Sequence, residues 1–159
     1  MTLEQAEALD AADPLASYRA QFMCPAGVIY LDGNSLGQLP LATVQAGAEA
    51  VTQAWGERLI RGWNEGWIDA PQRVGAMIAS LIGAAPDEVI SADSTSVNLY
   101  KLIVAALRLD PKRNVVVSEA GNFPTDLHIA EGAVAAVAGA ELRVVERGAL
   151  AEALGDDTA

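Results

Sequence analysis

Apolar residues in the second half of the chain follow two patterns, short unbroken runs and stripes at helical spacing. Val115, Val116 and Val117 form an unbroken run, which is typical of a strand buried on both faces of a parallel sheet. Residues 72–82 carry apolar side chains three and four positions apart, which predicts a helix that ends at Gly83. From residue 72 onward, the apolar runs and the helical stripes alternate along the chain. The predicted strands are 89–91, 114–118 and 141–145, and the predicted helices are 72–82, 96–108, 125–138 and one from about Ala149.

This alternation predicts an α/β fold class, in which β/α units build a mostly parallel sheet that helices cover on both faces. The preceding residues predict an N-terminal helical segment. A short helix at 3–9 and a second from Asp13 to about Phe22 lead to a strand at 28–31 and a flexible turn at 32–37. A long helix then runs from Pro40 to about Arg61, with one apolar stripe made of Val44, Ala48, Val51, Trp55 and Leu59. We therefore expect two domains, 1–70 and 71–159.

Composition narrows the functional classes. The net charge of −11 argues against a nucleic-acid partner, which needs a basic surface. No apolar run approaches the length that crosses a bilayer, and the first residues do not read as a signal peptide, so we expect a cytoplasmic protein with no membrane partner. Cys24 and His128, the single cysteine and histidine, cannot form a zinc site without other ligands, and no metal is expected. We interpret Cys24 as a small apolar filler and His128 as an ordinary helix residue.

A hydroxyl-rich turn at Ser94, Thr95 and Ser96 precedes the apolar helix that is predicted to be buried. The free N–H groups and the dipole at a helix start favour an anion, and the hydroxyls add donors for a phosphate. The same residue types are preferred helix caps, so the residues alone favour capping. Ligands of parallel sheets bind beyond the carboxyl ends of the strands, which places 91–96 and 119–126 on one rim.

Aromatic residues in two loops leave further alternatives open. Phe123 precedes Pro124, which leads into the next helix, and its ring either stacks on a flat ligand or staples the helix start. Trp63 and Trp67 lie in the loop after the long helix. They either wall a planar substrate or anchor the loop to the body.

Four segments together resemble the kynureninases, which are pyridoxal-phosphate enzymes of the fold type I superfamily. They are IYLDGNSLG (29–37), WGERLIRGW (55–63), STSVNL (94–99) and NFPTDLHIAEG (122–132). By this resemblance the second domain is the first part of a pyridoxal-phosphate-binding large domain, and the first domain carries loops on the substrate side. The implied cofactor-binding residues are Thr95, Ser96, Phe123, Pro124, Thr125 and Asp126, and the implied substrate-binding residues are Trp63, Asn34 and Ser35. Asp126 either bonds to the cofactor or caps its own helix.

The resemblance implies hydrolytic cleavage of the Cβ–Cγ bond of L-kynurenine, or its 3-hydroxy form, to anthranilate or 3-hydroxyanthranilate and L-alanine. This reaction belongs to tryptophan catabolism and pyridine nucleotide biosynthesis. The cofactor is pyridoxal 5′-phosphate, whose ring is an electron sink, and the family enzyme is expected to be a homodimer. The family's lysine is expected downstream, because Lys101 and Lys112 stand in no matching motif.

Three parallel strands leave an open apolar sheet edge. We therefore interpret the chain as the N-terminal part of a kynureninase, a fragment or a truncated gene product, with no catalytic residue of its own and no activity alone. Two alternatives remain. One is another fold type I enzyme, such as a cysteine desulfurase or an aminotransferase-like protein, and the other is a non-catalytic remnant.

Overall fold

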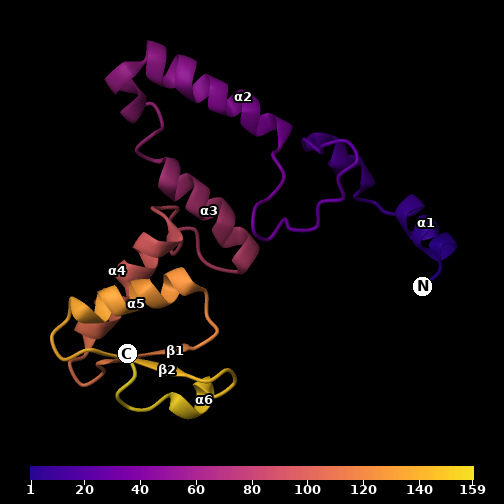
Figure 1. Cartoon of the computed structure of the whole chain (residues 1–159). Helices are drawn as coiled ribbons and strands as arrows, with labels where there is room; N and C mark the ends of the chain where they lie inside the picture. Colours follow the sequence, from indigo (N-terminus) through magenta and orange to yellow (C-terminus); the bar gives the residue numbers. More distant parts are fainter. The chain divides into compact units, whose positions relative to one another are not determined.

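The computed structural model describes residues 1–159, which form two compact units, Met1–Ala70 and Pro71–Ala159. Figure 1 labels the main elements. The first unit contains α1 (Leu3–Ala11), the 3₁₀ helix η1 (Ala16–Gln21), α2 (Leu41–Glu49), the π-helix η2 (Ala50–Glu57) and the 3₁₀ helix η3 (Leu59–Trp63). The elements that follow are α3 (Ala70–Ile82), α4 (Thr95–Leu109), β1 (Val115–Glu119), α5 (Pro124–Ala135), β2 (Glu141–Val145) and α6 (Leu150–Ala153).

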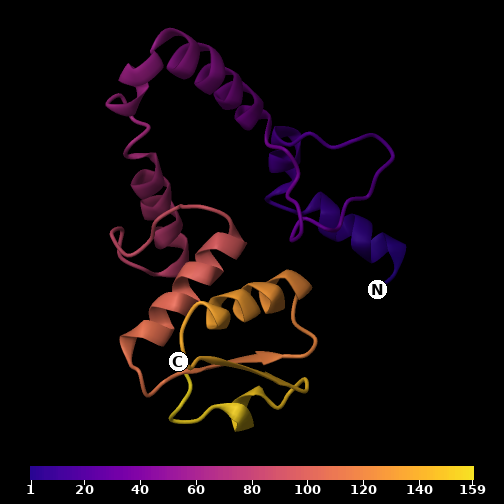
Figure 2. The ribbon, with the colours of Figure 1, turned by 60° about the vertical axis from the view of Figure 1, so that its left-hand side comes forward.

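The second unit is built on a parallel pair of strands. β1 and β2 pair in register from Val115 opposite Glu141 to Glu119 opposite Val145. The crossover helix α5 packs on one face of the pair and α6 on the other, and α4 packs against α5 (Figures 1 and 2). The predicted α/β class with parallel strands is therefore confirmed, and the strand predicted at 141–145 has the expected bounds.

The hydrophobic core of the second unit contains few residues. Its buried apolar residues are Ala79, Leu107, Val115, Ala130 and Ala133. The solvent-accessible surface of the chain is 12242 Å², whereas two separate compact units of half its mass would expose about 9,100 Å² together. The two units therefore expose more surface than compact domains of their size. The prediction that α4 is a buried helix is wrong for most of its length, since Leu107 alone is buried and Leu102 is 68% exposed. Only one face of α4 meets another element, which explains why an apolar sequence did not become a buried helix.

Two predicted strands are not formed. Residues 28–31 are irregular, because the first unit offers them no strand as a partner; the Tyr30 hydroxyl instead donates to the Leu36 carbonyl at 2.6 Å and closes the turn. Residues 89–91 are also irregular and lie along α3, where the Ser91 amide donates to the Pro71 carbonyl at 3.1 Å. An apolar run predicts extended backbone but not a pairing partner, and both strand predictions fail for this reason.

Three helices also differ from their predictions. The helix expected from Asp13 is a 3₁₀ segment that starts only at Ala16. The long helix after Pro40 changes to π geometry at Ala50, so its apolar stripe is not a single α-helical face. The last helix is one turn, Leu150–Ala153. Apolar spacing alone does not distinguish α from π or 3₁₀ geometry when the side chains are as exposed as these.

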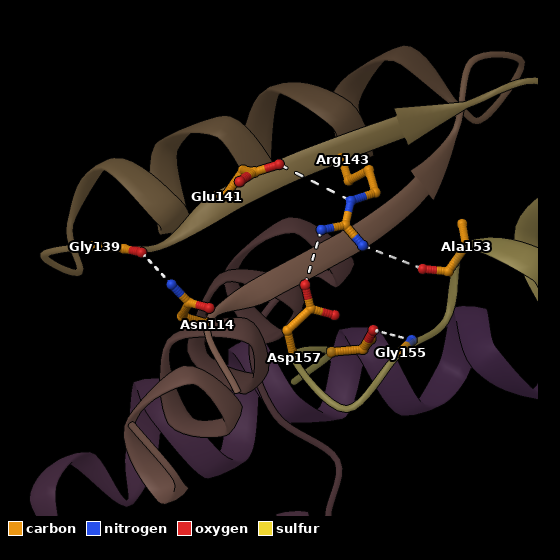
Figure 3. Close-up of polar contacts among 8 residues, drawn as sticks. Asn114, Gly139, Glu141, Arg143, Ala153, Gly155 and Asp157 are labelled. Carbon is orange, nitrogen blue, oxygen red and sulfur yellow. Dashed lines mark hydrogen bonds and ion pairs between the residues drawn. The ribbon is translucent and has the colours of Figure 1, made fainter. Parts of the chain in front are cut away.

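Residues 155–159 are attached to the strand pair by the side chain of Arg143 (Figure 3) and by the backbone of Val115. Arg143 of β2 donates to the Asp157 carboxylate at 2.9 Å and to the Ala153 carbonyl at 3.3 Å, and Glu141 lies 3.9 Å away. The Val115 amide donates to the Asp157 carbonyl, and the Ala159 amide donates to the Val115 carbonyl, both at 2.9 Å. The second edge of β1 therefore has a parallel partner that sequence reasoning had not assigned.

Gly75 sets how closely α3 approaches residues 89–90. A Cβ at this position would lie 2.0 Å from the Val89 carbonyl oxygen and 2.9 Å from the Ile90 Cα. We expect Gly75→Ala to destabilise the second unit by about 1–3 kcal/mol, as overpacking against backbone does. Gly132→Ala is the control, because it meets open space in a helix and should stabilise by about 0.5–1 kcal/mol. Urea unfolding of both variants measures the effect, and equal midpoints would contradict the close approach.

Acid should release residues 155–159 from β1. The hydrogen bond from Arg143 holds the pKa of Asp157 below its usual range. The stabilisation is therefore present above the ordinary aspartate pKa of about 3.9 and is lost as the pH falls through the lowered value. We expect Asp157→Asn at neutral pH to reduce hydrogen-exchange protection of the Val115 and Ala159 amides about two- to fivefold. Asp156→Asn should leave both unchanged, and unchanged protection in Asp157→Asn would contradict the attachment.

Candidate functional site

At the start of α4, one residue caps the helix and the next two carry hydroxyls that have no hydrogen-bond partner in the chain. Ser94 is the N-cap, and its hydroxyl accepts a hydrogen bond from the Val97 amide at 3.4 Å. The Asn98 side chain donates to the Ala92 carbonyl at 2.7 Å and fixes the chain that enters the helix. The hydroxyls of Thr95 and Ser96 make no hydrogen bond within the chain, and Thr95 is exposed while Ser96 is half-buried. The capping alternative therefore accounts for Ser94 alone.

An ion pair lies next to these hydroxyls. Asp93 has a positive φ of 43°, a backbone conformation in which aspartate is tolerated, and its carboxylate is paired with the Lys101 ammonium two turns into α4. A free carboxylate at this point would repel a bound anion. The Lys101 charge offsets that repulsion, so the helix start can hold an anion despite the acidic composition.

The loop before α5 presents Phe123 with its ring largely free. Phe123 is the N-cap residue, Pro124 is the first residue of α5, and the Asn122 side chain accepts from the Phe123 amide at 2.8 Å. The Phe123 side chain is 68% exposed, which does not fit a hydrophobic staple. No side chain caps α5, so Asp126, which is half-buried, does not act as the cap. Thr125 is exposed.

The parallel strands bring these two helix starts to one side of the second unit. Figures 1 and 2 show α4 and α5 beginning on the same side, and in Figure 2 the β1 arrow points toward it. α4 and α5 are in direct contact with each other. The donors of Thr95 and Ser96 and the ring of Phe123 thus share the side at which ligands of parallel sheets bind.

The remaining candidates, Trp63, Asn34 and Ser35, lie in the first unit. Trp63 ends η3 and meets Trp67 edge to face, with ring centroids 6.4 Å apart and planes at 73°. The two rings line a cavity of about 300 Å³ with Trp55, Leu59 and Ile60. Ser35 donates to the Asp32 carboxylate at 2.8 Å, whereas Asn34 is exposed and makes no hydrogen bond within the chain. Trp63 is therefore both an anchor against Trp67 and, at 52% exposure, accessible to a ligand.

Sequence reasoning missed the pair Arg58–Glu65, which brackets the segment that carries Trp63. The Arg58 Nε donates to Glu65 Oε2 at 2.7 Å, and the second guanidinium nitrogen pairs with Oε1. These hydrogen bonds hold the pKa of Glu65 below its usual range, with a smaller contribution from the Arg61 charge, and raise the pKa of Arg58. The two residues lie seven positions apart, in the turns on either side of η3, and this spacing offers no sequence signal by which to predict the pair.

The structure contains no group of three or more His, Cys, Asp or Glu residues arranged to hold a metal ion. None of its helices combines the length and apolar character that a membrane crossing requires.

Comparison with known proteins tests the resemblance to kynureninases. No profile of a known family matches the chain. Kynureninases of Burkholderia mallei strain SAVP1 and Burkholderia pseudomallei strain K96243 are each 52% identical over an alignment of 165 positions that covers 99% of this chain. The kynureninase of Pseudomonas fluorescens is 52% identical over 130 residues, 79% of this chain and 31% of the relative. The resemblance to kynureninases is confirmed. The chain spans 40% of the length of the two Burkholderia relatives.

The start of α4 allows capping and ligand binding to be tested apart. We expect Ser94→Ala to cost about 1 kcal/mol of stability, the usual loss when a helix cap is removed. Thr95→Ala should change stability by less than about 0.5 kcal/mol, because its hydroxyl has no partner in the chain. Thermal or urea unfolding checks both values. A larger loss for Thr95→Ala than for Ser94→Ala would contradict the assignment of the cap.

Proposed function

We propose that this chain carries the cofactor-phosphate side of a kynureninase. The whole enzyme would cleave the Cβ–Cγ bond of L-kynurenine or 3-hydroxykynurenine by hydrolysis, giving anthranilate or 3-hydroxyanthranilate and L-alanine, in tryptophan catabolism. The observation that carries the proposal is 52% identity to curated kynureninases across 99% of this chain. The activity, the substrate and the expected homodimer are proposals for the whole protein. A cytoplasmic location without nucleic-acid or membrane partners is proposed with them.

The residues at the start of α4 fit the phosphate of pyridoxal 5′-phosphate. The Thr95 and Ser96 hydroxyls and the first free amides of the helix form a set of donors without acceptors in the chain. The helix dipole adds partial positive charge at the same point. Lys101 neutralises Asp93, the carboxylate next to this donor set. In this proposal Thr95 and Ser96 bind and orient the phosphate.

The loop before α5 supplies a surface for a flat ring. Phe123 is proposed to stack on the pyridine ring, and Pro124 fixes the direction in which α5 leaves the loop. Thr125 and Asp126 are proposed to line the same pocket, with the Asp126 carboxylate free because it caps no helix. When bound, the cofactor supplies an electron sink for charge that develops at the α-carbon of the amino acid.

The first unit is proposed to supply the substrate side. Trp63 would pack against the aryl ring of the substrate, and Asn34 and Ser35 would donate hydrogen bonds near it. Neither lysine of this chain stands in a Schiff-base motif, and both lie on the surface, Lys101 paired with Asp93 and Lys112 in a turn. We therefore propose that these 159 residues bind the cofactor phosphate but do not turn over L-kynurenine by themselves.

A ligand pair that differs only in phosphate tests this proposal. Pyridoxine 5′-phosphate and pyridoxine lack an aldehyde, so neither forms adducts with surface lysines. We expect the phosphate ester to bind more tightly, and Thr95→Ala/Ser96→Ala to weaken it about tenfold or more, the value of one or two hydrogen bonds to a charged group. Calorimetric titration measures both affinities.

Ser80→Ala is the control for this titration, because it removes a hydroxyl that only bonds back to the Met77 carbonyl in α3. Its affinity for pyridoxine 5′-phosphate should equal that of the unmodified chain. Equal affinity for the two ligands, or a double variant that binds as well as the control, would overturn the phosphate site.

A further inference from the structure

The ion pair Arg58–Glu65 links the two ends of the segment that carries Trp63. Both guanidinium contacts go to the two oxygens of one carboxylate, which fixes direction as well as distance. The side chains are 46% and 41% exposed, and an exposed ion pair contributes little to the stability of a fold. We therefore expect the pair to fix the position of residues 59–64 and to add little to the free energy of unfolding.

Between Arg58 and Glu65, the backbone at Leu59 is in an unfavourable conformation. The π-helix η2 ends where the Arg58 amide donates to the Gln53 carbonyl at 3.0 Å. The next residue, Leu59, has a φ of 50°, in the left-handed region that branched and bulky side chains avoid. Such a conformation persists only where surrounding contacts enforce it. The pair Arg58–Glu65 spans this residue and supplies one such contact.

The second contact is a close approach at Gly62. This residue is buried, and a Cβ there would lie 2.9 Å from the Ala54 carbonyl oxygen and 3.4 Å from the Trp67 ring. η3 thus folds back on both η2 and Trp67. Trp63, the next residue, meets Trp67 edge to face and lines the cavity of about 300 Å³.

From this geometry we propose that Arg58 and Glu65 are positioning residues that hold the Trp63 ring as the wall of an aryl site. The ligand class is a planar aromatic amine or acid, and this part of the inference rests on the proposed function. Arg58 and Glu65 act through the Leu59–Trp63 backbone and touch no ligand. Without the pair, Leu59 relaxes out of the left-handed region and Trp63 leaves its edge-to-face position.

The Trp63–Trp67 pair provides a spectroscopic readout within this chain, the exciton couplet of two coupled indoles in circular dichroism. Trp67→Phe should abolish the couplet and so assign it. Glu65→Gln, which removes the charge, and Arg58→Lys, which keeps the charge but removes the fork, should each reduce it by about half or more, with no change in the urea midpoint. The double exchange Arg58→Glu/Glu65→Arg should restore part of it.

Glu57→Gln is the matched control. It also removes one negative charge next to Arg58, but the Glu57 side chain makes no hydrogen bond to Arg58. It should leave the couplet intact. An unchanged couplet in both Glu65→Gln and Arg58→Lys would overturn the positioning role.

Anthranilate binding separates this inference from the proposed function. We expect the chain to bind anthranilate, and Glu65→Gln to weaken it about threefold or more while Glu57→Gln does not. A couplet that collapses in Glu65→Gln with no anthranilate binding to the unmodified chain would overturn the aryl site and leave Arg58 and Glu65 as positioning residues. Anthranilate binding that is equal in all variants would overturn the link between the ion pair and the ligand.

Discussion

Parallel pairing of β1 with β2 is the constraint on which the candidate cofactor site depends. Parallel strands require a crossover, and α5 provides it, so the loop with Phe123 must leave β1 at its carboxyl end. α4 packs along α5 and starts on the same side. Thr95 and Ser96 are separated from Phe123 by more than twenty residues, and the topology alone returns them to one side of the unit. The fold thereby brings a helix start with free donors and an exposed aromatic ring to the same side of the unit.

Local electrostatics decide whether an anion can bind to so acidic a chain. A net charge of −11 gives no general attraction for a phosphate. The donors of Thr95 and Ser96 act within hydrogen-bond distance, where they outweigh a screened long-range field. The Asp93–Lys101 pair removes the carboxylate that would oppose them most directly. In the first unit, Arg58 and Glu65 use charge differently, to fix a backbone that carries a ring.

The sequence predicted the elements that repeat a strong period and missed those that depend on a partner. Residues 141–145 and 72–82 carry clear patterns, and β2 and α3 lie there. Residues 28–31 and 89–91 are apolar, but whether they pair depends on a neighbouring strand that no local pattern specifies. Residues 157–159 pair with the Val115 backbone of β1, and Asp157 also pairs with Arg143 of β2, which lies fourteen residues away in the sequence. The hydroxyl-rich helix start at Ser94–Ser96, in contrast, could be predicted from the sequence, because the preference for such residues at a helix start is local.

Geometry also resolved two alternatives that residue types had left open. Ser94 alone serves as the cap, which frees Thr95 and Ser96, and the exposed ring of Phe123 does not staple its helix. The start of α4 is proposed to bind the cofactor phosphate. Amide chemical-shift mapping on addition of pyridoxine 5′-phosphate tests this most directly. We expect the largest shifts at the Thr95 and Ser96 amides, with smaller ones at Phe123. Shifts that avoid these amides, or that are as large with pyridoxine, would contradict it.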